Sequence, residues 1–458
     1  MYFECNLPKK VPTYYAPEIY GKLQSCVDKV YARTAFLNTA CDRMEARGMR
    51  PATFHALAKK AFQNGAERFD TLSVDELCTL VELLNTGVEY PDRIEWPNVD
   101  VLFDTAFVTI PEWELLRHVG IGGSDSSVPM GVSPYQTEEG LWYEKLGYPE
   151  LVSDDDRQAI FDRGHFMEDK VIDAFCKLIG AERIPETRMF RSKKYPFATA
   201  NPDAVLRLIS SGKLELFEAK SAMNVYSKVS EWFGSNVPPN YVSQCHHYIA
   251  VLDDDRIDGC CIGMIPCKDM VIGGVYCGSD FDPDRYFHAF IMPDELYEDQ
   301  LMAEEENFWN SYIVTGVKPR RSMNAELDKK VAETYLPTPK SDPEAPPVAL
   351  PYDRHKETLE QLMKAEEEVS SANKQLENLK NFRDGLRIEF LGLIGAAQEA
   401  VFNGADGNPK IVVKNTLVQK VGIDAKLLKQ VFPEAYEKCS KPRQETRFSI
   451  KEAKPKKT

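Results

Sequence analysis

The chain has 458 residues, of which 43% are hydrophobic and 28% charged, values typical of a soluble globular protein with two or more domains. It contains no apolar run long enough to span a bilayer and no signal-peptide pattern, so we expect a cytoplasmic protein without membrane contact. The net charge of −15 excludes a uniformly basic surface, but a local basic groove can still bind DNA. The eleven cysteines include no Cys-x-x-Cys pair, which favours buried thiols over a zinc or iron–sulfur site.

Residues 1–95 are expected to form a helical N-terminal extension. The apolar spacing of residues 20–35 and 52–63 is typical of amphipathic helices. Residues 89–97 contain two prolines and predict a linker or turn. A second unit, residues 96–335, follows and contains every motif with recognisable chemistry.

The second unit begins with a glycine-rich segment, Arg117-His-Val-Gly-Ile-Gly-Gly-Ser-Asp-Ser-Ser127. A loop rich in glycine and serine that leads into a helix is a ready anion site, and Arg117 adds a bidentate donor for phosphate. The segment is not a P-loop, because the Gly-Lys-Ser/Thr ending is missing, and it is not a dinucleotide fingerprint. Without the motifs downstream it would predict only a capped helix.

Four short motifs follow in order: Gly164-His165-Phe166-Met167-Glu168, Asn201-Pro202-Asp203, Glu218-Ala219-Lys220 and Gln244-Cys245-His246-His247-Tyr248. Three of them contain a carboxylate, and the third adds a lysine two residues after its carboxylate. Each motif alone is weak, because Pro-Asp is a common turn and Glu-x-Lys is a common solvated pair on strands. Together, their order and spacing predict a nuclease-type site that holds hard divalent cations and cleaves phosphodiesters.

The catalytic residues are expected on and beside one strand. Residues 214–220 alternate as a strand should, which puts Glu218 and Lys220 on the same face. Asp203 follows a strand-like run at residues 195–200. Because Mg²⁺ keeps several waters, a few carboxylates suffice to hold it beside a phosphate. We therefore predict that Asp203, Glu218 and Lys220 are catalytic, with Lys220 orienting the attacking water or stabilising transition-state charge.

Two helices are expected to flank this strand. Glu168 is expected at the start of one, where it either completes a second metal position or is simply an acidic residue favoured in the first turn. His165 is a weaker candidate metal ligand. Gln244 and Tyr248 share a face of the other helix, so Gln244 could donate to a phosphate with Tyr248 packed behind it. The pair His246-His247 is interpreted as a feature of the helix surface.

The C-terminal part begins with a proline-rich linker at residues 336–351, which resists regular structure. A long helix is predicted over residues 352–403, with two seven-residue series: Leu362, Val369 and Leu376, and Ala365, Ala372, Leu379, Leu386 and Leu393. This seam favours a coiled coil or hairpin for self-association or partner docking, while a helix packed on its own domain fits equally well. Residues 404–458 are expected to form a small segment with a strand at 411–413 and a helix at 424–431.

The second unit resembles YqaJ-like phage recombination nucleases, which belong with lambda-type exonucleases to the PD-(D/E)xK superfamily. Three segments carry this resemblance: Gly120-Ile-Gly-Gly-Ser-Asp-Ser-Ser127, Gly131-Val-Ser-Pro-Tyr135 and Leu141-Trp-Tyr-Glu-Lys-Leu-Gly147. The four later motifs are similar to the remaining motifs of the group, which RecB-type nuclease domains share. The resemblance covers residues 110–315 and does not include residues 1–95 or the C-terminal helix.

The resemblance implies an α/β (α+β) fold with a restriction-endonuclease-like core, in which helices flank a central mixed sheet. The helical N-terminal extension and the C-terminal coiled-coil-like helix are additions to this core. The resemblance also implies two Mg²⁺ or Mn²⁺ ions, with Lys220 as the catalytic lysine and four ligands: Glu168, Asp203, Glu218 and the backbone carbonyl of Ala219. The 5′-terminal phosphate of DNA would be held by Arg117, Ser124 and Gln244.

The activity implied by the resemblance is 5′→3′ degradation of one strand of linear duplex DNA. The 3′ overhang would pass to a single-strand annealing protein during phage or prophage recombination in a bacterial host. Expected partners are therefore double-stranded DNA ends, the annealing protein and further copies of the chain in a homo-oligomer. Two alternatives stay open: a structure-specific or restriction-like endonuclease on the same fold, and a DNA-binding or scaffold protein that recruits the annealing partner.

Overall fold

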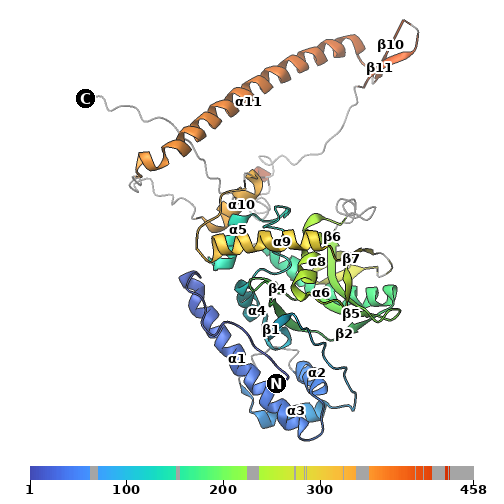
Figure 1. Cartoon of the computed structure of the whole chain (residues 1–458). Coiled ribbons are helices and arrows are strands. Elements are labelled where there is room, and N and C mark those ends of the chain that lie inside the picture. The colour runs from blue at the N-terminus through green and yellow to red at the C-terminus, as the bar shows by residue number, and fades with distance from the viewer. Residues whose placement is uncertain are drawn as a thin grey trace. The chain divides into compact units, whose positions relative to one another are not determined.

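The computed structural model describes residues 1–61, 71–150, 155–223, 237–272, 275–282, 284, 286–322, 324–336, 350–397, 399–405, 407–414, 429–431 and 433. The chain divides into two compact units, Met1–Pro337 and Thr338–Thr458 (Figure 1). No described helix combines the length and apolar composition that crossing a bilayer requires.

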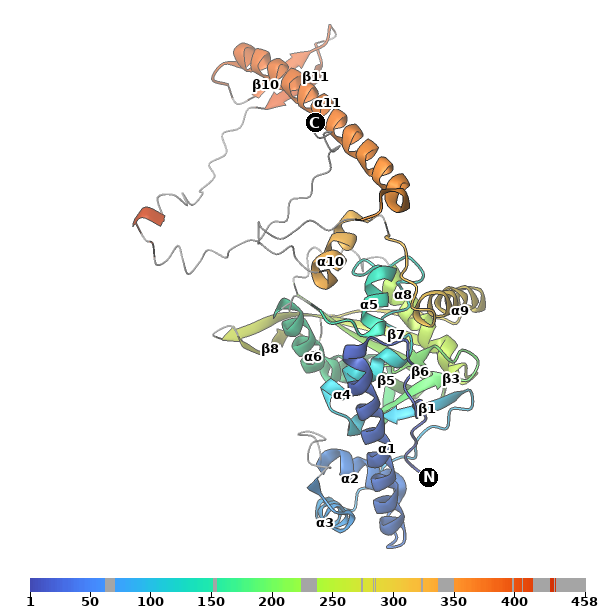
Figure 2. The ribbon, with the colours of Figure 1, turned by 90° about the vertical axis from the view of Figure 1, so that its left-hand side faces the viewer.

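Three helices open the first unit: α1 (Pro17–Glu45), α2 (Pro51–Ala61) and α3 (Val74–Leu84). They confirm the predicted helical start of the chain, and Figure 2 shows them side by side around the N-terminus. Their apolar faces bury Phe54 and Leu77 in a core that also contains Phe107. A second core joins Val27 of α1 to Phe103 beyond the predicted boundary. Residues 1–95 therefore share their cores with the elements that follow.

A six-stranded sheet occupies the centre of the first unit, in the order β2-β5-β6-β7-β8, with β9 also paired to β7. The strands are β2 (Ala181–Ile184), β5 (Ala204–Leu208), β6 (Leu214–Met223), β7 (Ile257–Ile272), β8 (Val275–Phe281) and β9 (Phe287–Ile291). Only the β6–β7 pair is parallel among these pairings, so the sheet is mixed, as predicted. A smaller antiparallel sheet consists of β1 (Val99–Asp104), β3 (Arg188–Ser192) and β4 (Thr199–Ala200).

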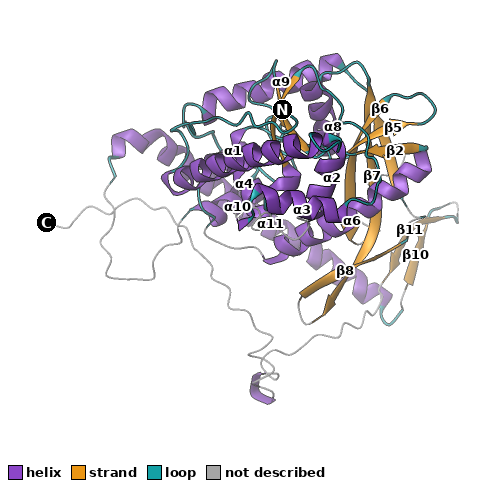
Figure 3. Ribbon diagram, turned by 90° about the horizontal axis from the view of Figure 1, so that it is seen from below, coloured by secondary structure: helices purple, strands orange, loops and turns teal. Residues whose placement is uncertain are grey.

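Helices cover both faces of the central sheet, which Figure 3 shows as strands flanked by helices. On one face, Phe217 of β6 packs in a core with Phe175 of α6 (Asp155–Ile179). On the other face, Leu216 packs in a core with Cys245 of α8 (Pro239–Leu252). The alternation of β6 thus directs odd-numbered residues to α6 and even-numbered residues to α8. The remaining helical elements are η2 (Thr105–Phe107), α4 (Ile110–Leu116), η3 (Arg117–Val119), α5 (Glu138–Leu146), α9 (Glu295–Phe308), the π-helical turn η5 (Trp309–Ile313) and α10 (Ala325–Tyr335).

Two predicted helix starts in this unit are wrong. α6 begins at Asp155, so Glu168 lies well inside the helix and not in its first turn. Gly164 does not end the helix, since an internal glycine costs only about 1 kcal/mol relative to alanine. The glycine-rich loop leads into successive turns rather than a helix, and α5 begins only at Glu138. Pro129 and Pro134 explain the second difference, because each lacks the N–H that a continuing helix needs.

The C-terminal unit, Thr338–Thr458, contains α11 (Tyr352–Ile394) and a hairpin of β10 (Glu399–Asn403) and β11 (Pro409–Lys414). The long helix is shorter than predicted, because it ends where Gly395 adopts a φ of +60°. The predicted strand at residues 411–413 is part of β11. Most of the predicted linker (residues 337–349), and residues 424–428 of the predicted terminal helix, lie outside the described residues.

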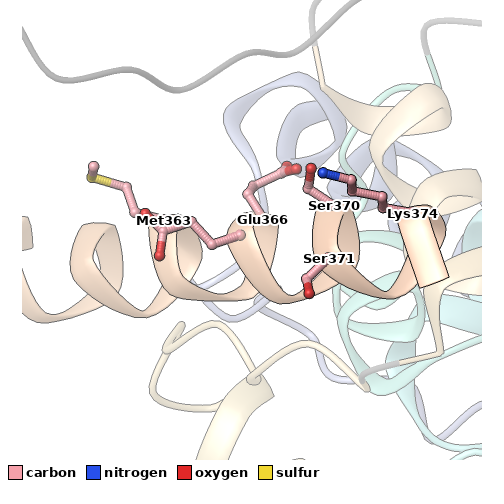
Figure 4. Close-up of a pocket in the computed structure, with 6 residues that line it drawn as sticks. Met363, Glu366, Ser370, Ser371 and Lys374 are labelled. Carbon is pink, nitrogen blue, oxygen red and sulfur yellow. The ribbon is translucent and has the colours of Figure 1, made fainter.

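No residue of α11 is buried, although the heptad residue Leu393 is strongly apolar. A surface hollow of about 500 Å³ lies along this helix, lined by Met363, Glu366, Glu367, Ser370, Ser371 and Lys374. Figure 4 shows that its lining side chains project from the single helix. Since no second described element encloses the hollow, we assign it no ligand.

Candidate active site

The centre of the candidate site is the even-numbered face of β6. Strand alternation places Glu218 and Lys220 on one face of β6, where the ammonium of Lys220 forms an ion pair with Glu218 Oε1. Glu218 is only 3% exposed, and its second oxygen, Oε2, has no hydrogen-bond partner among the described residues. Although burial alone would lower the pKa of Lys220, the carboxylates of Glu218 and Asp203 raise it above its ordinary value. The lysine is therefore held protonated against a buried carboxylate.

Helix α8 places an amide over this ion pair. Gln244 Oε1 accepts a hydrogen bond from Lys220 Nζ at 3.2 Å, and Gln244 Nε2 donates to Glu218 Oε1 at 2.7 Å. The same Nε2 donates to the hydroxyl oxygen of Tyr248 at 3.0 Å, one helical turn further along α8. Gln244 therefore contacts both charged groups of β6 and has its orientation fixed by Tyr248. Among the described residues, no hydrogen bond joins it to Arg117 or Ser124, with which the sequence grouped it.

Two further carboxylates face the same region. Asp203 lies between β4 and β5, where its Oδ2 accepts a hydrogen bond from the backbone N–H of Ala219 at 2.7 Å. Burial raises the pKa of Asp203 well above its ordinary value, and Glu218 and Glu168 raise it further. Burial, Asp169 and Glu218 likewise raise the pKa of Glu168 on α6. These shifts mean that the negative charges of three carboxylates repel one another across the site.

The donor chemistry of this cluster fits a hard divalent cation. Carboxylate oxygens are the ligands that Mg²⁺ and Mn²⁺ prefer, and the buried Glu218 Oε2 lacks a partner within the described residues. Burial, and then repulsion between carboxylates, raises the pKa values of Asp203 and Glu168, and a bound cation would offset both. Nevertheless, no described group of three or more His, Cys, Asp or Glu side chains is close enough to hold an ion. In the described residues, Glu218 instead pairs with Lys220, and Asp203 accepts a hydrogen bond from Ala219 N–H.

Two predicted ligands cannot be placed at this centre. The side chain of His165 lies outside the described part of the structure. The role of the Ala219 carbonyl stays a prediction, since the described contact of Ala219 with the carboxylates is made through its N–H.

Arg117 and Ser124 come together at the glycine-rich loop. The guanidinium of Arg117 donates to Ser124 Oγ at 2.9 Å and lies 4.9 Å from the ring centroid of Trp113. The side chain of Arg117 is 29% exposed, so part of the guanidinium remains accessible to solvent. A fixed guanidinium beside a hydroxyl is a suitable donor set for a phosphate.

The loop adjoins the carboxylate–lysine cluster through Gly123 and Tyr248. A Cβ atom built on Gly123 would lie 2.5 Å from Cε1 of the Tyr248 ring, so only glycine allows this approach. Because Tyr248 in turn orients Gln244, the loop and the β6 ion pair are connected by two contacts.

Gly123→Ala is accordingly expected to displace the Tyr248 ring, to destabilise the fold by about 1–3 kcal/mol, and to lower kcat by misplacing Gln244. Gly122→Ala is the matched control, because its Cβ would meet nothing nearer than Asp125 Oδ2 at 3.6 Å. Thermal unfolding and nuclease assays of both variants check this. Equal effects of the two substitutions would contradict the proposed approach of Tyr248.

The sequence did not predict two buried histidine–glutamate contacts between α8 and α9. His246 and His247 are both buried, so their interpretation as a helix surface feature is wrong. His247 contacts Glu305 of α9 through Nδ1 at 2.8 Å and the carbonyl of Thr199 through Nε2 at 2.9 Å. His246 Nδ1 similarly lies 3.1 Å from Glu298 of α9. The only sequence signal was the seven-residue spacing of two glutamates on α9, which puts them on one helix face.

Comparison with known proteins gives a family match and a related protein. The family described as "YqaJ-like viral recombinase domain" matches residues 112–255. The uncharacterized protein YqaJ of Bacillus subtilis (strain 168) is 26% identical over 354 residues, which are 77% of this chain and 98% of that protein.

Two solved structures are also similar. An alkaline exonuclease (LHK-Exo) from Laribacter hongkongensis has 16% identity and a TM-score of 0.34, covering 49% of this chain and 99% of its own. A phage-related exonuclease from Haemophilus somnus 129PT has 15% identity and a TM-score of 0.32, covering 44% of this chain and 97% of its own.

The family match confirms the resemblance drawn from the motifs. It spans all the residues that the structure groups here: Arg117, Ser124, Glu168, Asp203, Glu218, Lys220, Gln244 and Tyr248. Residues 112–255 therefore match the YqaJ-like viral recombinase domain, and the Bacillus subtilis relative is similar over most of the chain.

Proposed function

We propose that the chain is a metal-dependent 5′→3′ exonuclease of double-stranded DNA that leaves 3′ single-stranded overhangs for phage-type recombination. The observation that carries this proposal is the contact set Glu218–Lys220–Gln244 on β6 and α8, beside Asp203 and Glu168. A buried carboxylate cluster with a protonated lysine suits hydrolysis of a phosphodiester. The family match with a viral recombinase domain favours DNA as the substrate.

In this proposal, Asp203, Glu218, Glu168 and the carbonyl of Ala219 hold one or two Mg²⁺ or Mn²⁺ ions. When bound, such ions activate water and neutralise charge on the phosphate. Lys220, released from Glu218, orients the attacking water or donates to the phosphate oxygens as negative charge develops. Gln244 keeps the ammonium of Lys220 directed at the same point, since its amide contacts both Lys220 and Glu218.

The polarity of degradation is the sharpest test of this function. A linear duplex labelled at the 5′ end of one strand should release labelled mononucleotides at once in Mg²⁺. The same duplex labelled at the 3′ end should release its label only late. The reverse order would reject 5′→3′ polarity, and cleavage of covalently closed circles would favour the alternative of a structure-specific or restriction-like endonuclease.

We further propose that Arg117 and Ser124 hold the 5′-terminal phosphate. Arg117→Ala is expected to reduce the preference for phosphorylated over hydroxyl ends by about tenfold to a hundredfold, the value of a hydrogen bond to a charged group. Arg191→Ala is a control, because that arginine pairs with Asp100 on the smaller sheet. KM measured on both ends checks the expectation, and an unchanged ratio in Arg117→Ala would remove the end-sensing role.

The C-terminal unit, Thr338–Thr458, is proposed to serve association rather than hydrolysis. Apart from Leu362, which is half-buried, the heptad residues of α11 are exposed, which suits pairing with another copy or with a single-strand annealing protein in the bacterial host. Removal of residues 338–458 should leave hydrolysis per active site within about twofold and lower the oligomeric mass seen by light scattering. Loss of hydrolysis at unchanged mass would contradict this division of roles.

A further inference from the structure

A buried ion pair joins the glycine-rich loop to helix α5. Lys145, in the last turn of α5, is 1% exposed, and Asp125 in the loop is 4% exposed. Their charged atoms, Lys145 Nζ and Asp125 Oδ2, are 2.5 Å apart. Asp125 Oδ2 also accepts from the backbone N–H of Gly122 at 2.8 Å, so the carboxylate is part of the loop turn itself.

Asp125 faces two cations and not one. Its other oxygen, Oδ1, lies 3.9 Å from a guanidinium nitrogen of Arg117. The same nitrogen donates to Ser124 Oγ. Although burial alone would raise the pKa of Asp125, Lys145 and Arg117 hold it below its ordinary value, so the carboxylate is charged. Any negative charge that Lys145 did not balance would therefore act on Arg117.

Lys145 also reaches the backbone of Arg117. Its ammonium donates to the carbonyl oxygen of Arg117 at 3.1 Å. One buried lysine thus contacts both the residue that carries the guanidinium and the carboxylate that competes for it. A phosphate at Arg117 would lie beyond reach of this fully buried ammonium, so Lys145 acts through other groups.

We propose that Lys145 is a positioning residue that neutralises Asp125 and so keeps the guanidinium of Arg117 available to a 5′-terminal phosphate. The inference rests on the proposed role of Arg117 and Ser124 in holding that phosphate. Without Lys145, the Asp125 carboxylate would close the 3.9 Å gap and pair with Arg117. The phosphate would then compete with an internal anion for the same donor.

The charge argument predicts opposite effects for the two partners of the buried pair. Lys145→Met should bring the ratio of dissociation constants for hydroxyl and phosphorylated ends close to one. Asp125→Asn keeps an acceptor for Gly122 and removes the competing charge, so the ratio should rise above the wild-type value of about tenfold to a hundredfold. The double variant Asp125→Asn/Lys145→Met should restore the wild-type ratio.

The test is fluorescence anisotropy of the full chain with 5′-phosphorylated and 5′-hydroxyl duplexes in EDTA, where no hydrolysis occurs. The ratio does not depend on the fraction of folded protein, so a merely structural role of the pair would leave it unchanged. A wild-type ratio in Lys145→Met, no rise in Asp125→Asn, or no recovery in the double variant would each overturn the inference. If Lys145→Met fails to fold, the other two variants decide.

Equal affinity of the wild-type chain for both ends would also overturn the inference. Hydrolysis of the same duplexes after addition of Mg²⁺ would then report separately on the proposed nuclease function. Conversely, the predicted ratios in the wild type and the three variants, without hydrolysis by the wild type, would support the role of Lys145 and reject the nuclease.

Discussion

Glu218→Gln is expected to abolish hydrolysis of linear duplex DNA, lowering kcat by on the order of 10³-fold or more. The substitution keeps the shape of the side chain and removes the negative charge that pairs with Lys220 and that a divalent cation would need. Lys220→Ala should lower kcat by about 10²–10³-fold, the usual effect of removing one transition-state donor. Initial rates of nucleotide release in Mg²⁺ check both expectations, and DNA binding in EDTA should remain.

The matched control for Glu218 is Glu215→Gln. Glu215 lies on the same strand and is equally buried, but it belongs to the odd-numbered residues that face α6. Burial, and then Asp258, raises the pKa of Glu215 to about 8, so the amide replaces a carboxyl that is largely protonated at neutral pH. Hydrolysis should persist in Glu215→Gln. Activity retained in Glu218→Gln would reject the assignment of β6 as the catalytic strand.

Asp104→Ala is expected to reduce the free energy of unfolding by about 3–5 kcal/mol, because it leaves the buried guanidinium of Arg93 without its anion. Asp104 accepts hydrogen bonds from His55 Nε2 at 2.9 Å, Arg93 at 2.5 Å and Thr187 Oγ1 at 2.7 Å. These partners come from α2, from the segment before β1 and from the segment before β3. The carboxylate therefore connects helix α2 with the segments before β1 and β3. Urea unfolding should show the decrease in the free energy of unfolding.

The control for this prediction is Asp100→Ala on the same strand. Asp100 pairs with Arg191 at 3.4 Å with both side chains partly exposed, so its removal should cost less than about 1 kcal/mol. Arg93 and His55 hold the pKa of Asp104 far below its ordinary value despite burial. This stabilisation should be complete above the ordinary aspartate pKa of about 3.9 and be lost as pH falls below it. Equal unfolding energies of the two variants would contradict the role of Asp104.

The sequence predicts those parts of the site that depend on strand alternation or on the spacing of one helical turn. Strand alternation alone puts Glu218 and Lys220 on one face, and their ion pair in the structure follows from it. One helical turn separates Gln244 from Tyr248, and they are hydrogen-bonded. In the same way, apolar spacing predicted the N-terminal helices and the buried strand β6.

The parts that the sequence did not predict depend on contacts between distant segments. Nothing near Asp125 indicates that Lys145, twenty positions later, neutralises it, because a helix and a loop meet there only in the folded chain. A histidine in a polar stretch of sequence is expected at the surface. His247 is instead buried, where its ring contacts Glu305 of α9, which is 58 positions away in the sequence. The extent of α6 was missed for a different reason: Gly164 suggests a boundary that the long helix tolerates.

We propose that this carboxylate–lysine site hydrolyses DNA from its ends with a divalent cation. The most direct measurement is nucleotide release by the wild-type chain from linear duplex and from covalently closed circular DNA, in Mg²⁺ and in EDTA, with Lys220→Ala alongside. We predict release from linear DNA alone, only in Mg²⁺, and at least about a hundredfold slower in the variant. Release in EDTA, or release that is undiminished in Lys220→Ala, would contradict it.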